Sequence, residues 1–478
     1  MTVSHPKESL LLVWRQFLRR ILPFADVATV DLPLSRLLRL SLFQVSVGMA
    51  MVLLTGTLNR IMVVELAVPT WLVATMVALP LVFAPLRALI GHRSDYHRSA
   101  FGLRRIPYLW IGSLMQFGGF AIMPFALLLL ADTKNSLNIL GQFSAALAFL
   151  MVGAGLHTTQ TAGLALATDL APVEKRPRVV ALLYVTLLLG MLLSSLLFGQ
   201  LLTDFTPQLL IQLIQGAAAA TILLNLVALW KQEAIDRKRA ATPEKRPPFL
   251  ETWRAFSQGG RASRLLVVVG LGTAGFTMQD ILLEPYGGQI LRMTVSQTTA
   301  LTALLAGGTL LAFALAGRVL SRGGNTYRLS AGGAIVGLAA FAAVIFSASL
   351  GSTLLFRIGT ALIGFGAGLF SVGTLIAAMD LAEGGHSGLA LGAWGAVQAT
   401  ANGVAMAFGG GVRDMVSGLA AGGSLGADFS DPVVGYAFVY GVEILLLLVT
   451  LIAIAPLAFR TADKTRQPAS TIRLDQFP

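Results

Sequence analysis

The chain is built from long apolar segments separated by short polar ones. An apolar segment of about 20 residues can cross the ~30 Å hydrocarbon core of a bilayer as a helix. Backbone groups in that core must bond within the protein, and the segments lack the alternation that the strands of a membrane barrel show, so we predict helices. The twelve predicted spans are 40–64, 68–90, 106–130, 138–166, 178–202, 207–230, 264–290, 296–320, 329–350, 353–379, 387–412 and 433–459.

The composition agrees with this pattern. The 478 residues are 55% hydrophobic and 12% charged, whereas an ordinary soluble domain carries about 25% charged residues. This balance excludes a pair of soluble domains, a disordered chain and a secreted disulfide scaffold. The absence of cysteine excludes disulfides, thiolate metal sites and cysteine catalysis. We predict no cleavable signal peptide, because arginines interrupt the short apolar run near the N-terminus.

The basic residues gather in alternate connections between the predicted spans. With the N-terminus placed in the cytoplasm, the cytoplasmic segments hold 29 of the 35 lysines and arginines, as the positive-inside rule requires. We therefore predict a multi-pass membrane protein with both termini in the cytoplasm. The same bias accounts for the net charge of +12 without a nucleic-acid partner.

The two halves of the chain repeat. An Asp-Leu-Ala sequence ends both the fourth and the tenth span, at Asp169 and Asp380. Repeated six-helix halves are typical of the major facilitator superfamily, so we predict an all-α polytopic membrane protein with the major facilitator fold. The predicted segments are a cytoplasmic N-terminal segment (1–39) whose amphipathic helix at 9–22 lies against membrane lipids, a six-helix bundle (40–230), a cytoplasmic linker (231–263), a second six-helix bundle (264–459) and a cytoplasmic tail (460–478).

Loop 91–105 resembles the glycine–aspartate–glycine–basic signature that joins the second and third spans of facilitators, although it has extra residues after the aspartate. The resemblance implies a gate in which Asp95 pairs with a basic side chain or a helix N-terminus. The gating candidates at this side are Asp95, Arg104, Arg105 and Asp169. The alternative interpretation is an ordinary basic loop of the positive-inside kind.

Ionisable residues inside membrane spans are costly and are candidates for function. Asp280 and Glu284 are four residues apart and share a face of the seventh span, and Arg60 lies at similar depth in the first. We predict an ion pair between Arg60 and one of these two carboxylates. The pair is either a static contact between helices or a proton-sensitive latch. Glu443, in the twelfth span, has no predicted partner.

His157 is the histidine that lies well within a predicted span. A neutral imidazole can bind the magnesium of a chlorin, although a single histidine inside a membrane more often forms a packing hydrogen bond. The repeat relates His157 to Gly368, which lies in a glycine cluster with Gly364. We predict either tight helix packing at these glycines or a smooth groove for a flat hydrophobic pigment.

Four stretches together resemble a narrower family: 39–49, 56–62, 169–178 and 384–394. They are similar to the PucC/LhaA family, the bacteriochlorophyll-delivery branch of the major facilitator superfamily. The resemblance implies an assembly factor for the light-harvesting antennae of purple bacteria, with the core antenna favoured over the peripheral one. It implies bacteriochlorophyll as the bound pigment, antenna polypeptides and the reaction centre as partners, and the photosynthetic intracytoplasmic membrane as the location. It supplies no catalytic residues.

Two other function classes remain open. A proton-coupled transporter of a small solute would use Arg60, Asp280 and Glu284, although the spans offer few charged residues for a polar cavity. A membrane enzyme such as a prenyltransferase would need clustered acidic motifs that bind metal, and the sequence has none. We therefore expect a protein that is not an enzyme.

Overall fold

The computed structural model describes residues 33–82, 103, 105–131, 139–172, 176–232, 260–380, 387–422 and 431–460. The amphipathic segment 9–22, nearly all of the linker 231–263 and nearly all of the tail 460–478 lie outside the described residues. The boundaries predicted for these segments therefore stay predictions.

All regular structure in the described part of the chain is helical. The first membrane segment contains two π-helical stretches, η2 and η3, in which each turn holds one more residue than an α-helical turn. The elements are α2 (Leu34–Met51), η2 (Val52–Thr57), α3 (Leu58–Arg60), η3 (Ile61–Glu65), α4 (Thr70–Val82), α6 (Ile106–Ala131), α7 (Ile139–Leu170), α8 (Arg176–Leu201), α9 (Pro207–Leu229), α11 (Gly260–Thr277), α12 (Gln279–Gln289), α13 (Val295–Ser321), α14 (Thr326–Ser349), α15 (Thr353–Asp380), α16 (Ser387–Ala421) and α17 (Val433–Arg460).

Each of the twelve predicted spans overlaps a helix. Ten helical segments in the described residues are long and apolar enough to cross a membrane, with α2 to η3 forming one of them and α11 with α12 another. The second predicted span is described only over α4, and the eleventh corresponds to α16; neither is among the ten. The helical membrane architecture is confirmed, whereas membrane crossing by these two segments stays a prediction.

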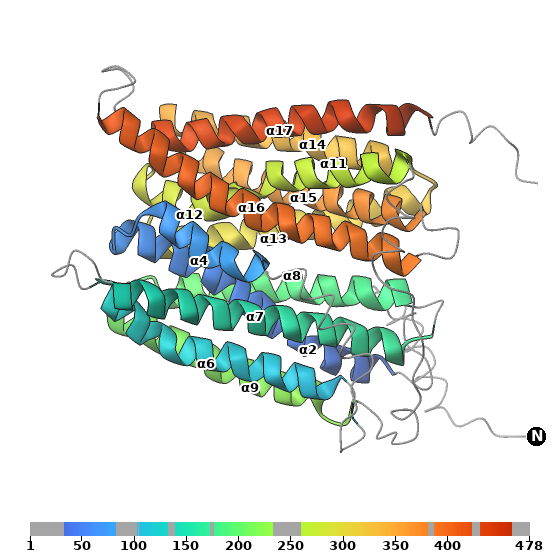
Figure 1. The fold of residues 1–478 in the computed structure, drawn as a ribbon, viewed down its shortest axis with the longest axis horizontal. Helices are drawn as coiled ribbons and strands as arrows, with labels where there is room; N and C mark the ends of the chain where they lie inside the picture. The colour runs from blue at the N-terminus through green and yellow to red at the C-terminus, as the bar shows by residue number, and fades with distance from the viewer. Residues whose placement is uncertain are drawn as a thin grey trace, which may run out of the picture.

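The helices form two groups that lie side by side (Figure 1). One group holds α2 to α9 and the other holds α11 to α17, and the groups pack together where α4 meets α16 and where α8 meets α13. Successive spans run in opposite directions, so α2 begins and α17 ends at the same end of the bundle. We call this the basic end, because Arg36 of α2, Arg178 of α8 and Arg318 of α13 lie there, and we call the opposite end the outer end.

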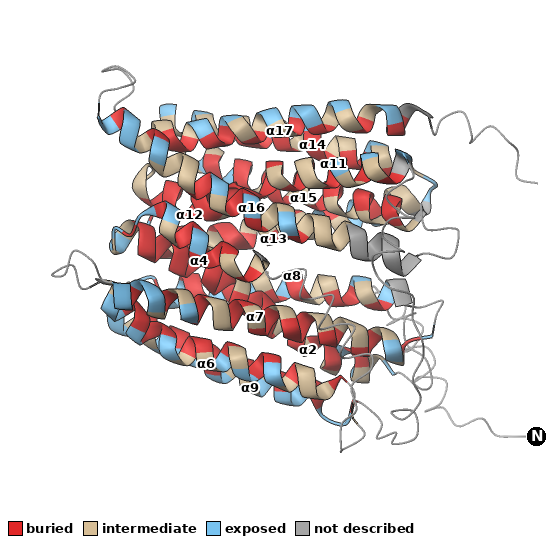
Figure 2. Cartoon of the chain, viewed as in Figure 1, coloured by how far each residue is buried: buried red, intermediate tan, exposed pale blue. Residues whose placement is uncertain are grey.

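Apolar side chains cover both the inside and the outside of the bundle. Figure 2 shows buried residues along the faces where helices meet and exposed residues on the outward faces. Large apolar side chains lie on these outward faces, among them Phe125, Leu350 and Ile452, which is 74% exposed. Such a surface is unfavourable in water and is expected where lipid tails surround the protein.

Candidate functional site

The first span is hydrogen-bonded directly to the second group of helices. The Asn59 amide nitrogen donates to the backbone oxygen of Ile281 at 2.8 Å. Two residues earlier, the hydroxyl oxygens of Thr57 and Thr299 lie 3.3 Å apart. Both contacts start from the stretch that contains η2 and α3. Because π-helical turns gather at functional sites, this junction is the first part of the candidate site.

Arg60 lies in this junction and is only 4% exposed. Its guanidinium forms an ion pair with Glu65 and donates to the backbone oxygen of Met293 at 3.3 Å. None of the ion pairs in the described residues joins Arg60 to Asp280 or Glu284, so the predicted direct pairing is wrong, although Arg60 still acts on the Glu284 carboxylate electrostatically. The reason is local: η3 has π-helical turns, which place a residue and its fifth successor on the same side of the helix.

The two carboxylates of α12 have different surroundings. Glu284 is 3% exposed, and its Oε1 accepts a hydrogen bond from the Thr302 hydroxyl at 2.8 Å. The same carboxylate packs on Gly56, where an added Cβ would overlap it. Asp280 is half-buried and accepts a hydrogen bond from the side chain of Gln279. Glu284 thus reaches α13 and the first span, while Asp280 contacts the start of its own helix.

Glu443 of α17 caps the helix that follows a break in the seventh span. α11 ends at Thr277 and α12 begins at Gln279, and the first amides of a helix lack partners within that helix. The Oε1 of Glu443 accepts from the Gln279 backbone nitrogen at 2.8 Å, and the Glu443 side chain is fully buried. The sequence marked Glu443 as a buried acid but gave no sign of the helix break that it caps.

At the outer end, Arg413 and Asp414 of α16 hold the start of α4. Arg413 pairs with Asp414 at 2.7 Å and donates to the Thr70 hydroxyl at 3.1 Å. The second oxygen of Asp414 accepts from the Trp71 backbone nitrogen at 2.7 Å. A carboxylate at the first turn of a helix satisfies free amides and favours the helix dipole. The two groups of helices are therefore joined by charge-assisted hydrogen bonds at this end.

Arg413 also binds the seventh and twelfth spans. Its second terminal nitrogen donates to the Gln289 side-chain oxygen at 2.6 Å, and that oxygen also accepts from the Tyr436 hydroxyl at 2.7 Å. The guanidinium carbon lies 4.5 Å from the centre of the Tyr436 ring, which is a cation–π distance. We call Thr70, Trp71, Gln289, Arg413, Asp414 and Tyr436 the outer-end cluster. Sequence reasoning missed this cluster, although an Arg-Asp pair within an apolar segment was a usable signal.

At the basic end, two of the gating candidates meet. The Nε of Arg105, just before α6, lies 3.0 Å from the Asp169 carboxylate near the end of α7. The Arg105 side chain is 5% exposed, whereas that of Asp169 is 49% exposed. Asp95 and Arg104 lie outside the described residues. The contact joins neighbouring helices, and a gating role for it stays a prediction.

His157 lies in the middle of α7 and is half-buried. Its backbone oxygen accepts from the Thr161 hydroxyl at 2.7 Å, and the neighbouring Thr159 hydroxyl accepts from the Gln116 amide at 2.9 Å. This part of α7 is therefore a polar stretch packed against α6. Pigment binding by His157 stays a prediction.

The two glycines predicted to line a pigment groove instead pack against α13. A Cβ on Gly364 would overlap the backbone oxygen of Leu305, and one on Gly368 would lie 2.8 Å from the Cβ of Ala312. The prediction of an open groove at Gly364 and Gly368 is wrong, because the space beside them is filled by the neighbouring helix. Of the two interpretations, tight packing is the one that the structure supports.

We expect Arg60→Gln and Glu284→Gln to differ in their effect on stability. Arg60→Gln removes the ion pair with Glu65, whose side chain is 38% exposed, so the loss is about 1–2 kcal/mol. Glu284→Gln keeps an oxygen for Thr302 and breaks no ion pair, so we expect a change below about 1 kcal/mol. Thermal unfolding in detergent measures both. Equal losses in the two variants would contradict the assignment of Glu65 as the partner of Arg60.

Comparison with known proteins gives both family and fold. The family described as PUCC protein matches residues 57–462. Protein PucC of Rhodovulum sulfidophilum is 59% identical over 405 residues, which are 83% of this chain and 89% of the relative. Protein PucC of Rhodobacter capsulatus is 53% identical over 449 residues, or 92% of this chain and 96% of the relative. The bacteriochlorophyll synthase 44.5 kDa chain of that species is 28% identical over 423 residues, or 87% of this chain and 93% of the relative.

Solved structures of transporters share the fold. A mutant of the nucleoside transporter NupG superimposes with a TM-score of 0.65 at 14% identity, over 87% of this chain and 99% of NupG. A bacterial homologue of the lysosomal transporter Spinster, inward-facing and unoccupied, gives 0.66 at 15% identity, over 91% of this chain and 98% of the homologue. At such low identity these likenesses show the major facilitator fold and nothing about substrates.

Proposed function

Because the chain belongs to the PucC family, we propose that it is an assembly factor for photosynthetic antenna complexes in the membrane of phototrophic bacteria. The observation that carries this proposal is the family match over residues 57–462, together with 59% identity to protein PucC of a photosynthetic bacterium. Membership of this family supports a role in photosynthetic complex assembly. The proposed location is the bacterial cytoplasmic membrane and its intracytoplasmic extensions, with both termini in the cytoplasm.

The finer part of the proposal concerns pigment and partners. We propose that the protein binds or delivers bacteriochlorophyll, contacts antenna polypeptides and the reaction centre, and serves the core antenna in preference to the peripheral one. One relative is named as a chain of bacteriochlorophyll synthase, which supports a link to this pigment. The exposed apolar faces of the bundle offer area for a hydrophobic macrocycle or a single-span partner helix. In this role the protein binds without catalysing a reaction.

A second candidate function is proton-coupled transport of a small solute. The observation that favours it is Glu284, whose Oε2 is buried and has no hydrogen-bond partner among the described residues. A buried carboxyl group that forms no direct ion pair is a candidate proton carrier inside a membrane. Uptake into proteoliposomes that depends on a proton gradient, and that Glu284→Gln abolishes, would favour this function over assembly.

The test of the assembly proposal is gentle purification from a phototrophic host, followed by absorption spectroscopy and identification of bound polypeptides. We expect bacteriochlorophyll absorption and core antenna polypeptides in the sample. Protein purified in parallel from a host that makes pigment but no antenna polypeptides separates pigment binding from antenna contamination. Colourless protein without antenna polypeptides would contradict the proposal, and peripheral antenna polypeptides in place of core ones would overturn the core preference.

His157→Ala tests the predicted pigment ligand. If the imidazole binds the magnesium of the chlorin, the variant loses most of its bound pigment or shifts the absorption band, because ligation alters the electronic spectrum of the macrocycle. Thr161→Ala is the matched control, since Thr161 lies one turn away on α7 and its hydroxyl bonds the His157 backbone oxygen. Unchanged pigment content and spectrum in His157→Ala would remove His157 as a ligand.

A further inference from the structure

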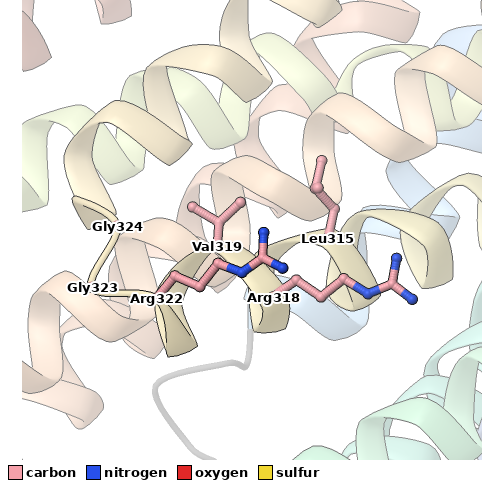
Figure 3. A pocket seen from close by; sticks show the side chains of 6 residues that line it. All are labelled: Leu315, Arg318, Val319, Arg322, Gly323 and Gly324. Atoms are coloured by element: carbon pink, nitrogen blue, oxygen red, sulfur yellow. The ribbon is translucent and has the colours of Figure 1, made fainter.

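A surface cavity of about 570 Å³ lies at the basic end of α13. Figure 3 shows the side chains of Arg318 and Arg322 extending along the same side of the helix, with Val319 and Leu315 beside them. The cavity is open on one side, and its volume falls in the range of small-molecule sites. Its lining residues are Leu315, Arg318, Val319, Arg322, Gly323 and Gly324.

The shape of the cavity follows from the way in which α13 ends. Leu315, Arg318, Val319 and Arg322 have the spacing of residues that share one helix face. Gly323 then has a φ of +78°, which a residue with a side chain rarely adopts, and no atom lies within 4 Å of the position of an added Cβ. The chain therefore turns away beneath the two arginines without filling the space in front of them.

The charged residues of the stretch that lines and follows this cavity, 318–328, are all basic. Arg318, Arg322 and, at the start of α14, Arg328 are all exposed, and no aspartate or glutamate occurs between residues 318 and 328. The exposed Arg178 lies at the same end near the start of α8, which packs against α13. Guanidinium groups one helical turn apart match the oxygens of a phosphate group, to which arginine can donate two hydrogen bonds.

Apolar side chains continue the same face of α13 toward the middle of the membrane. Leu315, which lines the cavity, is 40% exposed, and Leu311, one turn earlier, is 67% exposed. Since α13 is among the helices able to cross a membrane, this stripe lies at the depth of lipid tails. This face of α13 thus has cationic side chains at the membrane surface and apolar side chains below them. An anionic amphiphile has the complementary order, with a negatively charged headgroup above an apolar tail.

We propose that this cavity binds the phosphate headgroup of an anionic phospholipid, with Arg318 and Arg322 on the phosphate and an acyl chain along Leu315 and Leu311. Basic pockets beside membrane helices on the cytoplasmic side recognise anionic lipids in this way. Gly323 leaves room for the headgroup at the surface. Free phosphate shares the headgroup chemistry but cannot use the apolar track, so the two ligands are distinguishable.

The test uses the purified full-length protein after removal of endogenous lipid. Native mass spectrometry and thermal shifts compare phosphatidylglycerol, phosphatidylcholine with the same acyl chains, and inorganic phosphate. We expect phosphatidylglycerol to bind most tightly and more weakly at high salt. Arg318→Gln with Arg322→Gln is expected to weaken this binding about tenfold or more. Arg357→Gln is the matched control, because Arg357 is exposed at the outer end, near the start of α15.

Each result decides the proposal. Selective phosphatidylglycerol binding that the double variant loses and Arg357→Gln keeps supports it. Equal binding of phosphatidylcholine, equal protection by inorganic phosphate, or undiminished binding in the double variant overturns it. Arg322→Lys is a second test in case the double variant misfolds. It keeps the positive charge but not the planar guanidinium, so we expect phosphatidylglycerol binding between that of the native protein and that of the double variant. Its melting temperature in phosphatidylcholine is expected to be unchanged.

Discussion

Arg413→Gln is expected to destabilise the protein by about 3–5 kcal/mol, because it leaves one half of a mostly buried ion pair without its partner. The side chains of Arg413 and Asp414 are only 12% and 17% exposed. The substitution also removes the hydrogen bonds from the guanidinium to Thr70 and Gln289. The expected loss exceeds that for Arg60→Gln, because the partner of Arg60 is more exposed to solvent.

The same substitution is expected to loosen α4 from α16. The chain has no cysteine, so a single cysteine placed at the fully buried Ala74 of α4, which packs on Gly410 of α16, reports access to that contact. In detergent we expect a polar maleimide to label this cysteine about tenfold faster in the Arg413→Gln background. A tenfold increase corresponds to a free energy of opening for the contact that is lower by about 1.4 kcal/mol.

A matched variant separates the two causes of this loss. Arg413→Gln combined with Asp414→Asn removes both charges, so it leaves no uncompensated buried carboxylate, and we expect it to be more stable than Arg413→Gln alone.

One outcome for the single variant would contradict this role. If Arg413→Gln leaves both the labelling rate and the melting temperature equal to those of the native protein within experimental error, the outer-end cluster does not hold the two groups of helices together.

Gly364→Val is expected to destabilise the protein by about 3 kcal/mol or more, because its side chain would meet the backbone of α13 rather than a flexible side chain. The Leu305 carbonyl lies where the Cβ would be, and the Thr309 hydroxyl donates to the Gly364 backbone oxygen at 3.0 Å. The helices would have to separate, and this hydrogen bond would be lost with the apolar contact.

Gly332→Ala in α14 is the control for this substitution. No atom lies within 4 Å of the position of its added Cβ, so the alanine gains helix propensity at no steric cost, and we expect stabilisation by up to ~1 kcal/mol. Thermal unfolding measures both variants, and absorption spectroscopy measures whether each keeps the proposed pigment. If Gly364→Val folds with normal stability and loses only pigment, the packing assignment for Gly364 is wrong and the groove interpretation returns.

The candidate site was only partly predictable. Burial of charge inside an apolar segment is visible in the sequence, and it marked Arg60, Asp280, Glu284 and Glu443. The partners were not visible. A π-helical turn adds a residue and so rotates every later side chain by about 100° around the helix axis, which a straight-helix interpretation of the first span cannot anticipate. Arg60 therefore pairs with Glu65 of its own span and not with Asp280 or Glu284 of the seventh span.

The sequence by itself determined the helical membrane architecture and the family, because hydropathy and local motifs are properties of neighbouring residues. The basic residues likewise carry the predicted orientation in the sequence alone. The tertiary structure decided which faces meet: that Arg413 joins α16 to α4 and α12, that Glu443 caps α12, and that Gly364 lies against α13. These contacts depend on the rotation and depth of whole helices, which many weak packing interactions set together.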